Sequence, residues 1–170
     1  MKTISKILLG SVAVAGIGAG VAYTTQPDLK NQVNTLTPGT HKAGKTTVDD
    51  TKTNEELATT VIGLYGANHL ENNAHWKQVP VAFKSSTTLM KEPRTNTLTV
   101  YRILVPNTNQ TDAPYYELSG SDHNTVTFYD GTSTTPLAKV DLATVVKYVN
   151  AHYSDQQQQD CATRIKIQYS

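Results

Sequence analysis

Cysteine is almost absent from this chain, with Cys161 alone among 170 residues. A single thiol cannot form an internal disulfide, so we expect packing of apolar side chains to stabilise the fold. Cys161 and His152 could be imagined as a nucleophile and its base, but a lone cysteine beside the final strand is more often a small buried side chain. We therefore expect no catalytic role for Cys161.

The sequence also lacks the short patterns of common catalytic and nucleotide-binding sites. GxSxG, GxGxxG, the phosphate-binding P-loop, HExxH and CxxC are all missing. Such patterns place a nucleophile, a phosphate-binding loop or paired metal ligands, so their absence argues against several familiar enzyme classes. We expect no catalytic residues, no cofactor and no metal site.

Neither sign of charge is in excess. The chain has 15 Lys and Arg against 14 Asp and Glu, which gives a formal net charge of +1. Proteins that bind nucleic acid or anionic membrane surfaces usually carry a basic patch. We therefore expect no nucleic-acid partner, and a ligand that is recognised by shape and hydrogen bonds.

What is present begins with an uncharged segment near the N-terminus. Ile7 to Tyr23 contains no charged residue and follows Lys2 and Lys6. A basic start before an apolar run is typical of export signals, so residues 1–23 are predicted to be a signal peptide or an N-terminal membrane anchor. The length of the run lies at the border between the two, and both alternatives stay open. We expect an extracellular protein, either secreted or tethered to the outer face of the cell membrane.

Residues 24–52 are rich in Thr, Asn, Lys, Gly, Pro and Asp, and they contain few apolar side chains. A segment of this composition cannot bury enough apolar surface to fold, so it is predicted to be a disordered linker. The remaining residues, 53–170, are numerous enough for one hydrophobic core and are predicted to form a single domain.

Two amphipathic helices are predicted in this domain. The first begins where Thr53 and Glu56 have the spacing of a capping box. Its apolar residues are Leu57, Val61, Leu64 and Tyr65. Gly63 and Gly66 each cost about 1 kcal/mol relative to Ala in a helix, so they indicate a close approach to a sheet or a ligand. The second helix begins after Asp141, its predicted N-cap. Its apolar residues are Leu142, Val145, Val146, Val149 and Tyr153.

Strand patterns fill most of the remaining chain. The predicted strands are 97–105, Tyr115–Ser119, Thr125–Tyr129 and 163–169, and the first three, joined by short connections, are predicted to form an antiparallel meander. Val79–Phe83 is predicted to be an edge strand or a lead-in because it contains Pro80, and Pro136–Val140 a short strand or an extended lead-in. The strand 163–169 alternates, with Ile165, Ile167 and Tyr169 predicted to point inward. We predict an α+β fold in which an antiparallel sheet of four to five strands has two helices packed on one face.

Four pieces of the domain carry a resemblance to a known group of proteins. They are Leu64–Gly66, Tyr115–Ser121, Thr125–Tyr129 and Leu142–Val149. Together they resemble the small exported domains of unknown function found on lactic-acid bacteria, over about Glu55 to Asn150. The resemblance implies a Gram-positive surface protein with an α+β fold. That family has no established activity, so the resemblance implies no catalytic residues.

Tyrosine is the dominant aromatic residue, with nine Tyr against two Phe and one Trp. Tyrosines on a sheet can stack on sugars or peptides while their hydroxyls form hydrogen bonds. The candidate ligand-binding residues are Tyr101, Tyr115, Glu117 and Tyr129. Because Tyr115 and Tyr116 are adjacent on a strand, their side chains point to opposite faces. We expect Tyr116 in the core, and Tyr115 with Glu117 exposed.

Two groups of polar residues are weaker candidates for a site. His69, Glu71 and His75 could supply metal ligands, but the two histidines do not have the spacing that brings side chains together on a helix. Another group combines a hydroxyl, a carboxylate and an imidazole within one turn. It consists of Ser119, Ser121, Asp122 and His123. Neighbours in a tight turn point apart, so we do not expect them to form a catalytic relay.

Two functions from different classes follow. The first is an exported, non-catalytic binding or interaction module, whose unknown ligand belongs to the cell envelope, to a glycan or to another protein. The alternative is a small extracellular hydrolase or enzyme accessory with a site around His69, Glu71 and His75. A deep pocket with converging carboxylates or imidazoles would favour the enzyme, and a shallow aromatic face would favour the binding module.

Overall fold

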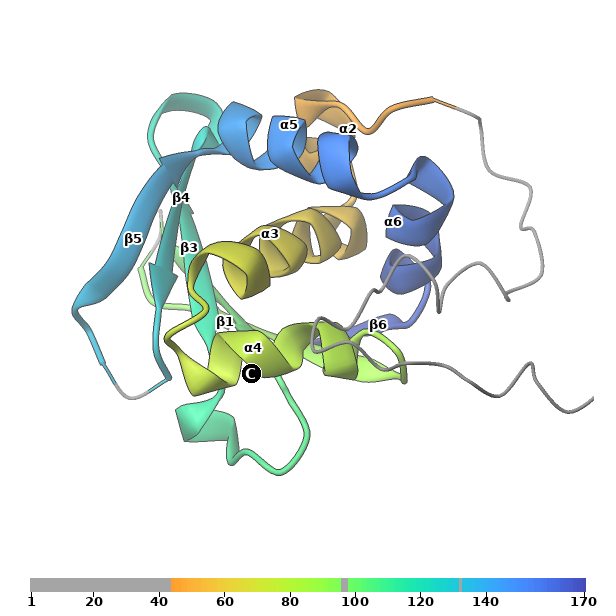
Figure 1. The fold of residues 1–170 in the computed structure, drawn as a ribbon. Helices are drawn as coiled ribbons and strands as arrows, with labels where there is room; N and C mark the ends of the chain where they lie inside the picture. The colour runs from red at the N-terminus through yellow and green to blue at the C-terminus, as the bar shows by residue number, and fades with distance from the viewer. Residues whose placement is uncertain (1–43, 96–97, 132) are drawn as a thin grey trace, which may run out of the picture.

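The computed structural model describes residues 44–95, 98–131 and 133–170 (Figure 1). The predicted signal or anchor, 1–23, and the predicted linker up to residue 43 lie outside the described residues. Within these ranges, no helix is long and apolar enough to cross a membrane. The described part combines a six-stranded sheet with helices, which confirms the predicted α+β class.

The strands of the sheet lie in the order β5-β4-β3-β2-β1-β6. Their bounds are β1 Thr87–Pro93, β2 Thr99–Ile103, β3 Tyr115–Ser119, β4 Thr125–Tyr129, β5 Pro136–Asp141 and β6 Ile165–Tyr169. Strands β1 to β5 pair antiparallel with one another, and β2, β3 and β4 form the predicted antiparallel meander. Strand β6 pairs parallel with β1, so the sheet is mixed. The prediction of an antiparallel sheet of four to five strands is wrong in strand number and in direction.

Both errors concern the pairing of β1 with β6. The polar residues Lys91 and Glu92 weaken the strand pattern of β1, and it was not predicted. The alternation in β6 identifies a strand but not its partner. Because β6 follows two helices, the chain can return along the sheet and join β1 in parallel. Tyr169 lies at the end of this edge strand and is 70% exposed, so its predicted inward position is wrong.

The helices lie together on one side of the sheet (Figure 1). Their bounds are α2 Val48–Thr53, α3 Glu55–His69, α4 Ala74–Ala82, α5 Leu142–His152 and α6 Asp155–Ala162. Both predicted helices are present as α3 and α5, and Asp141 caps α5 by accepting a hydrogen bond from the backbone of Ala143. The two-helix prediction therefore describes only part of a larger helical layer.

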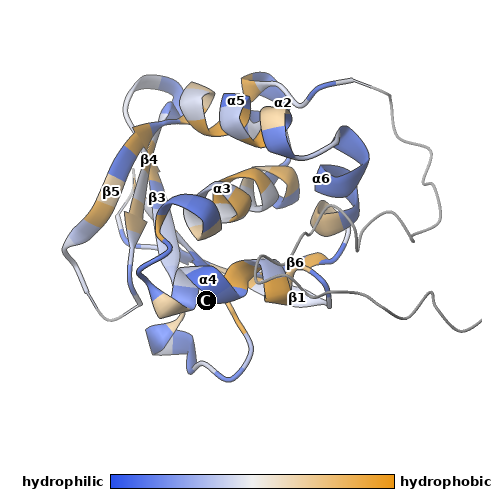
Figure 2. Ribbon diagram, in the orientation of Figure 1, coloured by the Kyte–Doolittle hydropathy of each residue, from blue (hydrophilic) through white to orange (hydrophobic). Residues whose placement is uncertain are grey.

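Helix α3 lies in the middle of this layer (Figure 1) and is not amphipathic along its first part. Every residue from Leu57 to Gly66 is buried. Figure 2 shows its apolar residues surrounded by the other helices and the sheet, whereas α6 is mostly polar. The predicted cap at Thr53 is wrong, because Thr53 ends α2 and the side chain of Asn54 accepts a hydrogen bond from Leu57 N.

The two glycines of α3 are sites of close approach. A Cβ added to Gly63 would lie 2.6 Å from the ring of Phe83, and one added to Gly66 would lie 2.5 Å from the ring of Trp76. The close approach is therefore present, but its nearest partners are not the predicted sheet or ligand. Its main partners are aromatic side chains of α4 and its C-terminal cap, and neither the sheet backbone nor a ligand is needed to explain it.

Helix α4 replaces the predicted edge strand at Val79–Phe83, which is wrong. The Asn73 side chain starts the helix by accepting hydrogen bonds from the backbone of His75 and Trp76. Pro80 inside the helix cannot donate a backbone hydrogen bond. Burial of Trp76 and Val79 against the core offsets this loss.

Folded structure begins before the predicted boundary at residue 53. Helix α2 occupies the last part of the predicted linker, and Thr47 and Asp50 form a capping box at its start. The side chain of Asn150 on α5 donates a hydrogen bond to the backbone carbonyl of Thr46 at 2.7 Å. Residues near Thr46 are therefore part of the domain, and the prediction of a disordered linker is wrong for this stretch.

Candidate ligand-binding pocket

A pocket of about 420 Å³ lies between the helical layer and the sheet. It is lined by residues of α2, α3, α5, β2 and β3, and by a short 3-10 turn, η3 (Ser121–His123), that connects β3 to β4. The lining residues come from three separate parts of the sequence, 51–62, 101–123 and residue 142. Ligand pockets in proteins have volumes of about 300–1,000 Å³, so this one can accept a small molecule.

Apolar side chains form part of the pocket lining. Ala58 and Ile62 are four residues apart on α3, so they lie on one face of that helix. Leu118 extends from β3, and Leu142 is the first residue of α5 after its Asp141 cap. These side chains give a ligand an apolar surface to pack against.

Two stacked tyrosines from neighbouring strands also line the pocket. Tyr101 of β2 pairs with Tyr116 of β3, and their rings are parallel with centroids 5.0 Å apart. The Tyr116 hydroxyl forms a hydrogen bond of 2.8 Å with the hydroxyl of Thr59 on α3. Burial raises the pKa of both tyrosines, so both hydroxyls are protonated at neutral pH. Tyr116 is in the core, as predicted, whereas Tyr101 is half-buried.

Charged and polar side chains complete the lining. Lys52 comes from α2, Glu55 from the first turn of α3, and Asp122 and His123 from η3. Lys52, Asp122 and His123 are exposed, whereas Glu55 is half-buried. The pocket therefore combines an apolar surface with hydrogen-bonding groups of both charge signs.

The η3 turn holds its two pocket residues in an unusual backbone conformation. Asp122 has φ 58° and His123 has φ 57°, both in the left-handed region. This conformation costs non-glycine residues roughly 1–2 kcal/mol each. Gly120, just before the turn, has φ 82°, which glycine adopts without that cost. Strained residues of this kind are frequent at binding sites.

An ion pair joins the pocket to strand β1. Lys91 Nζ donates a hydrogen bond to Glu55 Oε1. This hydrogen bond is the main reason that the pKa of Lys91 is raised. The ammonium also lies 5.8 Å from the ring centre of Tyr101 and 5.4 Å from that of Tyr169. Glu55 is thus neutralised by a fixed cation.

The acidic and imidazole groups of the pocket do not form a catalytic relay. Glu55 forms an ion pair with Lys91. Among the described residues, no hydrogen bond joins His123 to Asp122 or to Glu55. A general base normally needs a partner that orients its ring, as in the serine-protease relay. The pocket has some of the groups expected of an enzyme but not their arrangement.

The other predicted binding residues lie on the opposite face of the sheet from Tyr101. Tyr115 stacks on Tyr129 with ring centroids 4.6 Å apart, and its hydroxyl donates to the carbonyl of Ser133. Tyr115 is only 2% exposed, so its predicted exposure is wrong. The guanidinium groups of Arg94 and Arg102 cover its ring, at 5.3 and 4.8 Å from the ring centre.

Glu117 and Tyr129 bind each other on this second face. Tyr129 Oη donates to Glu117 Oε2 at 2.9 Å, and Arg94 Nη1 lies 3.7 Å from Glu117 Oε1. Burial, together with this hydrogen bond, raises the pKa of Tyr129 to about 12. Glu117 is buried, so its predicted exposure is also wrong. Three of the four predicted residues do come together, but as a set of internal contacts.

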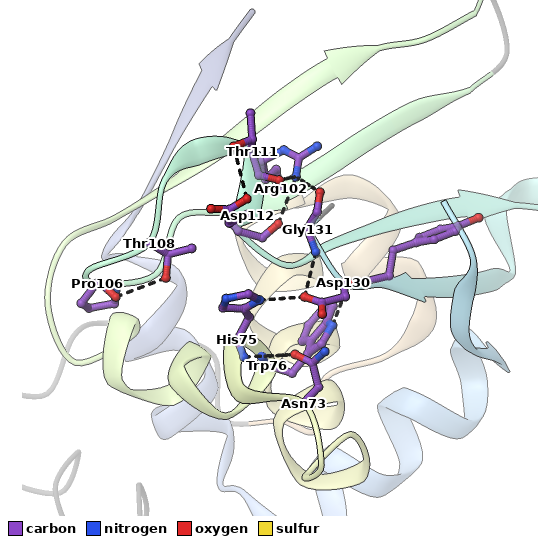
Figure 3. Close-up of polar contacts among 12 residues, drawn as sticks. Asn73, His75, Trp76, Arg102, Pro106, Thr108, Thr111, Asp112, Asp130 and Gly131 are labelled. Carbon is purple, nitrogen blue, oxygen red and sulfur yellow. Dashed lines mark hydrogen bonds and ion pairs between the residues drawn. The ribbon is translucent and has the colours of Figure 1, made fainter. Parts of the chain in front are cut away.

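A polar cluster ties α4 to the connection after β4 (Figure 3). His75 Nδ1 lies 2.7 Å from Asp130 Oδ1, and Trp76 Nε1 donates to the carbonyl of Tyr129 at 2.9 Å. Asp130 also accepts the backbone N–H of Gly131. The contacts of His75 and Trp76 join α4 to residues more than 50 positions away in the sequence, so the cluster stabilises the fold.

Arg102 holds the same region together from the sheet (Figure 3). Its Nη1 donates to the carbonyls of Thr111, Ala113 and Gly131, and its Nε donates to Glu92. A Cβ on Gly131 would lie 2.1 Å from the backbone of Asp112, so only glycine fits there. The buried guanidinium is satisfied by these acceptors, which explains how an arginine can be buried on a sheet face.

We expect Asp130→Asn to reduce stability at neutral pH by at most about 1 kcal/mol. Burial by itself would raise the pKa of Asp130, but hydrogen bonds from His75, Asn73 and Gly131 lower it below 3.8. The ionised carboxylate therefore stabilises the fold above pH 3.8, and this contribution is lost as the pH falls through the lowered pKa. Denaturant unfolding of both proteins should show a difference that shrinks on acidification. A difference that is independent of pH would contradict this, and Glu71→Gln, at an exposed carboxylate, is the control.

The structure does not assemble a site from His69, Glu71 and His75. The ring of His69 stacks on Tyr65 at 3.9 Å and contacts Tyr148 at 4.3 Å, whereas His75 binds Asp130. In the part of the chain that the structure describes, no group of three His, Cys, Asp or Glu side chains could hold a metal ion. Cys161 is buried, and burial raises the pKa of its thiol to about 12, so it is not a thiolate at neutral pH.

Only Tyr101 of the predicted binding residues lines the pocket. Asp122 and His123, which the sequence offered only as weaker candidates, line it as well. The other lining residues were missed as ligand contacts, because no local pattern indicates that α2 and α3 meet β2, β3 and η3. Comparison of the chain with protein-family models, with curated proteins and with solved structures gave no match.

Proposed function

We propose that this chain is an exported, non-catalytic binding protein of a Gram-positive cell surface, and that its ligand occupies the pocket beside Tyr101. The observation that carries the proposal is the pocket of about 420 Å³ with apolar side chains, stacked tyrosines and charged groups in its lining. A partly apolar pocket with a few polar groups is the usual form of a small-molecule site. The hydrolase alternative lacks support in the described part of the chain, where the acidic and imidazole groups of the pocket form no relay and no group of three could hold a metal ion.

Filling the pocket tests the binding site. Ala58 lies in the lining, and we expect Ala58→Leu to weaken binding by about tenfold or more, because the larger side chain occupies space that the ligand needs. The probe is a library of small aromatic and alicyclic fragments, followed by amide chemical-shift changes in the full-length protein. Hits should shift the amides of Tyr101 and Leu118.

The matched control is Ala143→Leu, which adds the same atoms to an exposed position on α5. This variant should bind fragments as the unchanged protein does, and thermal melting should show that both variants are folded. Equal binding by Ala58→Leu and Ala143→Leu would place the fragment site elsewhere. A library without any hit in the pocket would remove the basis of the proposed function.

The export part of the proposal rests on Lys2, Lys6 and the uncharged run Ile7–Tyr23. We expect alkaline phosphatase fused to the C-terminus to be active, because this reporter needs disulfides that form after export. Replacing two apolar residues of the run, Leu8 and Val12, by Arg should abolish the activity. An inactive fusion of the unchanged chain would contradict export. The membrane is a partner only through residues 1–23, if they are not cleaved.

A further inference from the structure

We infer that the pocket beside Tyr101 binds an uncharged, hydroxyl-rich ring, of which one hexose unit is the simplest example. The inference rests on the proposed function, since it assigns a ligand class to the same pocket. It follows from the charges, the hydrogen-bonding groups and the strand positions around that pocket.

The charges around the pocket are balanced. Glu55 is bound to Lys91, and the exposed ammonium of Lys52 is matched by the exposed carboxylate of Asp122. An anionic ligand would meet the carboxylates of Glu55 and Asp122. A cationic ligand would meet the ammonium group of Lys52 and a Glu55 that Lys91 already binds. Neither sign finds an unopposed partner, so a neutral ligand binds with the smallest electrostatic cost.

The hydrogen-bonding groups suit hydroxyls. Tyr101 provides a protonated hydroxyl, which can donate and accept, and the carboxylate of Asp122 accepts. The imidazole of His123 adds a further polar group beside them. A purely apolar ligand would bury these groups without partners, whereas each hydroxyl of a sugar can both donate and accept.

The apolar lining suits the other side of such a ring. Ala58, Ile62 and Leu118 offer aliphatic surface, and the stacked rings of Tyr101 and Tyr116 offer aromatic surface. A pyranose has a face of C–H groups that packs on surfaces of this kind, while its hydroxyls project toward the edge. A neutral hexose therefore matches both parts of the lining.

A peptide fits the pocket less well. Strands β2 and β3, which supply Tyr101, Tyr116 and Leu118, are interior strands with neighbours on both sides. Their backbone groups are used in the sheet, so they cannot pair with a peptide backbone as an edge strand does. Recognition in the pocket depends on side chains, and this favours hydroxyl groups over a main chain.

The test uses ligand-observed NMR and amide chemical-shift mapping on the full-length protein. The probes are glucose, galactose and N-acetylglucosamine, with glucosamine and glucuronic acid as cationic and anionic analogues and a capped tyrosine dipeptide for comparison. We expect at least one neutral sugar to shift the amides of Tyr101 and Leu118. It should bind about fivefold or more tightly than either charged analogue. The ammonium of glucosamine would lie near Lys52, and the carboxylate of glucuronic acid would lie near Glu55 and Asp122.

Two variants with the same chemical change separate the pocket from the opposite face. Tyr101→Phe should lower the affinity for the sugar by about threefold to tenfold, because the pocket loses one hydroxyl group. Tyr129→Phe removes a hydroxyl that donates to Glu117 on the other face and should leave binding unchanged. Melting curves check that both variants are folded. A trisaccharide that binds more tightly than its monosaccharide would identify a glycan chain as the source of the ring, and equal binding would identify a free sugar.

The contradicting outcomes are distinct. If a charged analogue or the dipeptide binds more tightly than every neutral sugar, the ligand class is wrong while the pocket remains the binding site. If no sugar binds but fragments occupy the pocket, the ligand class is again wrong and the proposed function stands. If neither sugars nor fragments bind there, both fail. Equal effects of Tyr101→Phe and Tyr129→Phe would also overturn the assignment.

Discussion

Replacing Trp76 with alanine is expected to lower the free energy of unfolding by about 3–5 kcal/mol. The indole is fully buried, packs edge-on against Phe128 at 5.2 Å and fills the space left by Gly66. Its Nε1 also donates to the carbonyl of Tyr129, which would lose this partner. Denaturant unfolding followed by far-ultraviolet circular dichroism measures the change.

The control for this experiment is Val81→Ala on the same helix. Val81 is 45% exposed, so its truncation should change the stability by no more than about 0.5 kcal/mol. A similar loss in both variants would mean that α4 is not anchored to the core through Trp76. Equal losses would also argue against a helix, instead of the predicted strand, at Val79–Phe83.

The second large effect is expected at Tyr115 and Tyr116. Replacing either residue with alanine should lower the free energy of unfolding by about 3 kcal/mol or more. Tyr116 is in the core under α3, and Tyr115 is enclosed by Tyr129 and two arginines on the other face. From the sequence, only Tyr116→Ala was expected to be costly. Thermal melting of the two variants, with Tyr169→Ala at a 70% exposed residue as control, decides between these expectations.

The stability of Tyr115→Ala also helps to locate the binding site. If Tyr115→Ala is as stable as the unchanged protein, the second face of the sheet is open, and Tyr115 with Glu117 returns as the recognition surface. If both variants are strongly destabilised, that face is filled by its own side chains. The pocket beside Tyr101 is then the better place for a ligand.

Sequence reasoning succeeded where a local pattern determines the structure. Strands β3 and β4 have the predicted bounds, and α5 begins after its predicted cap, Asp141. In each case the pattern involves neighbours within a few residues. It failed at α4, where the apolar run Val79–Phe83 suits a short strand and a buried helix equally, and a cap at Asn73 decided between them.

The candidate site was predicted only in part. Alternation along a strand correctly separates Tyr115 from Tyr116, but it does not say whether the second face is covered. Alternation also cannot relate one strand to the next. Tyr101 lies with Tyr116 because of the register between β2 and β3, so it faces away from Tyr115, Glu117 and Tyr129.

The sequence by itself therefore determined the α+β class, the antiparallel meander of β2 to β4 and the opposite faces of Tyr115 and Tyr116, because these depend on residue type and short-range periodicity. Only the tertiary structure decided that β6 joins β1 in parallel, that Arg102 and the loops cover Tyr115, and that α2, α3 and η3 enclose a pocket with Tyr101. These features depend on contacts between segments that are distant in the chain, and such contacts leave no periodic signal in a single sequence.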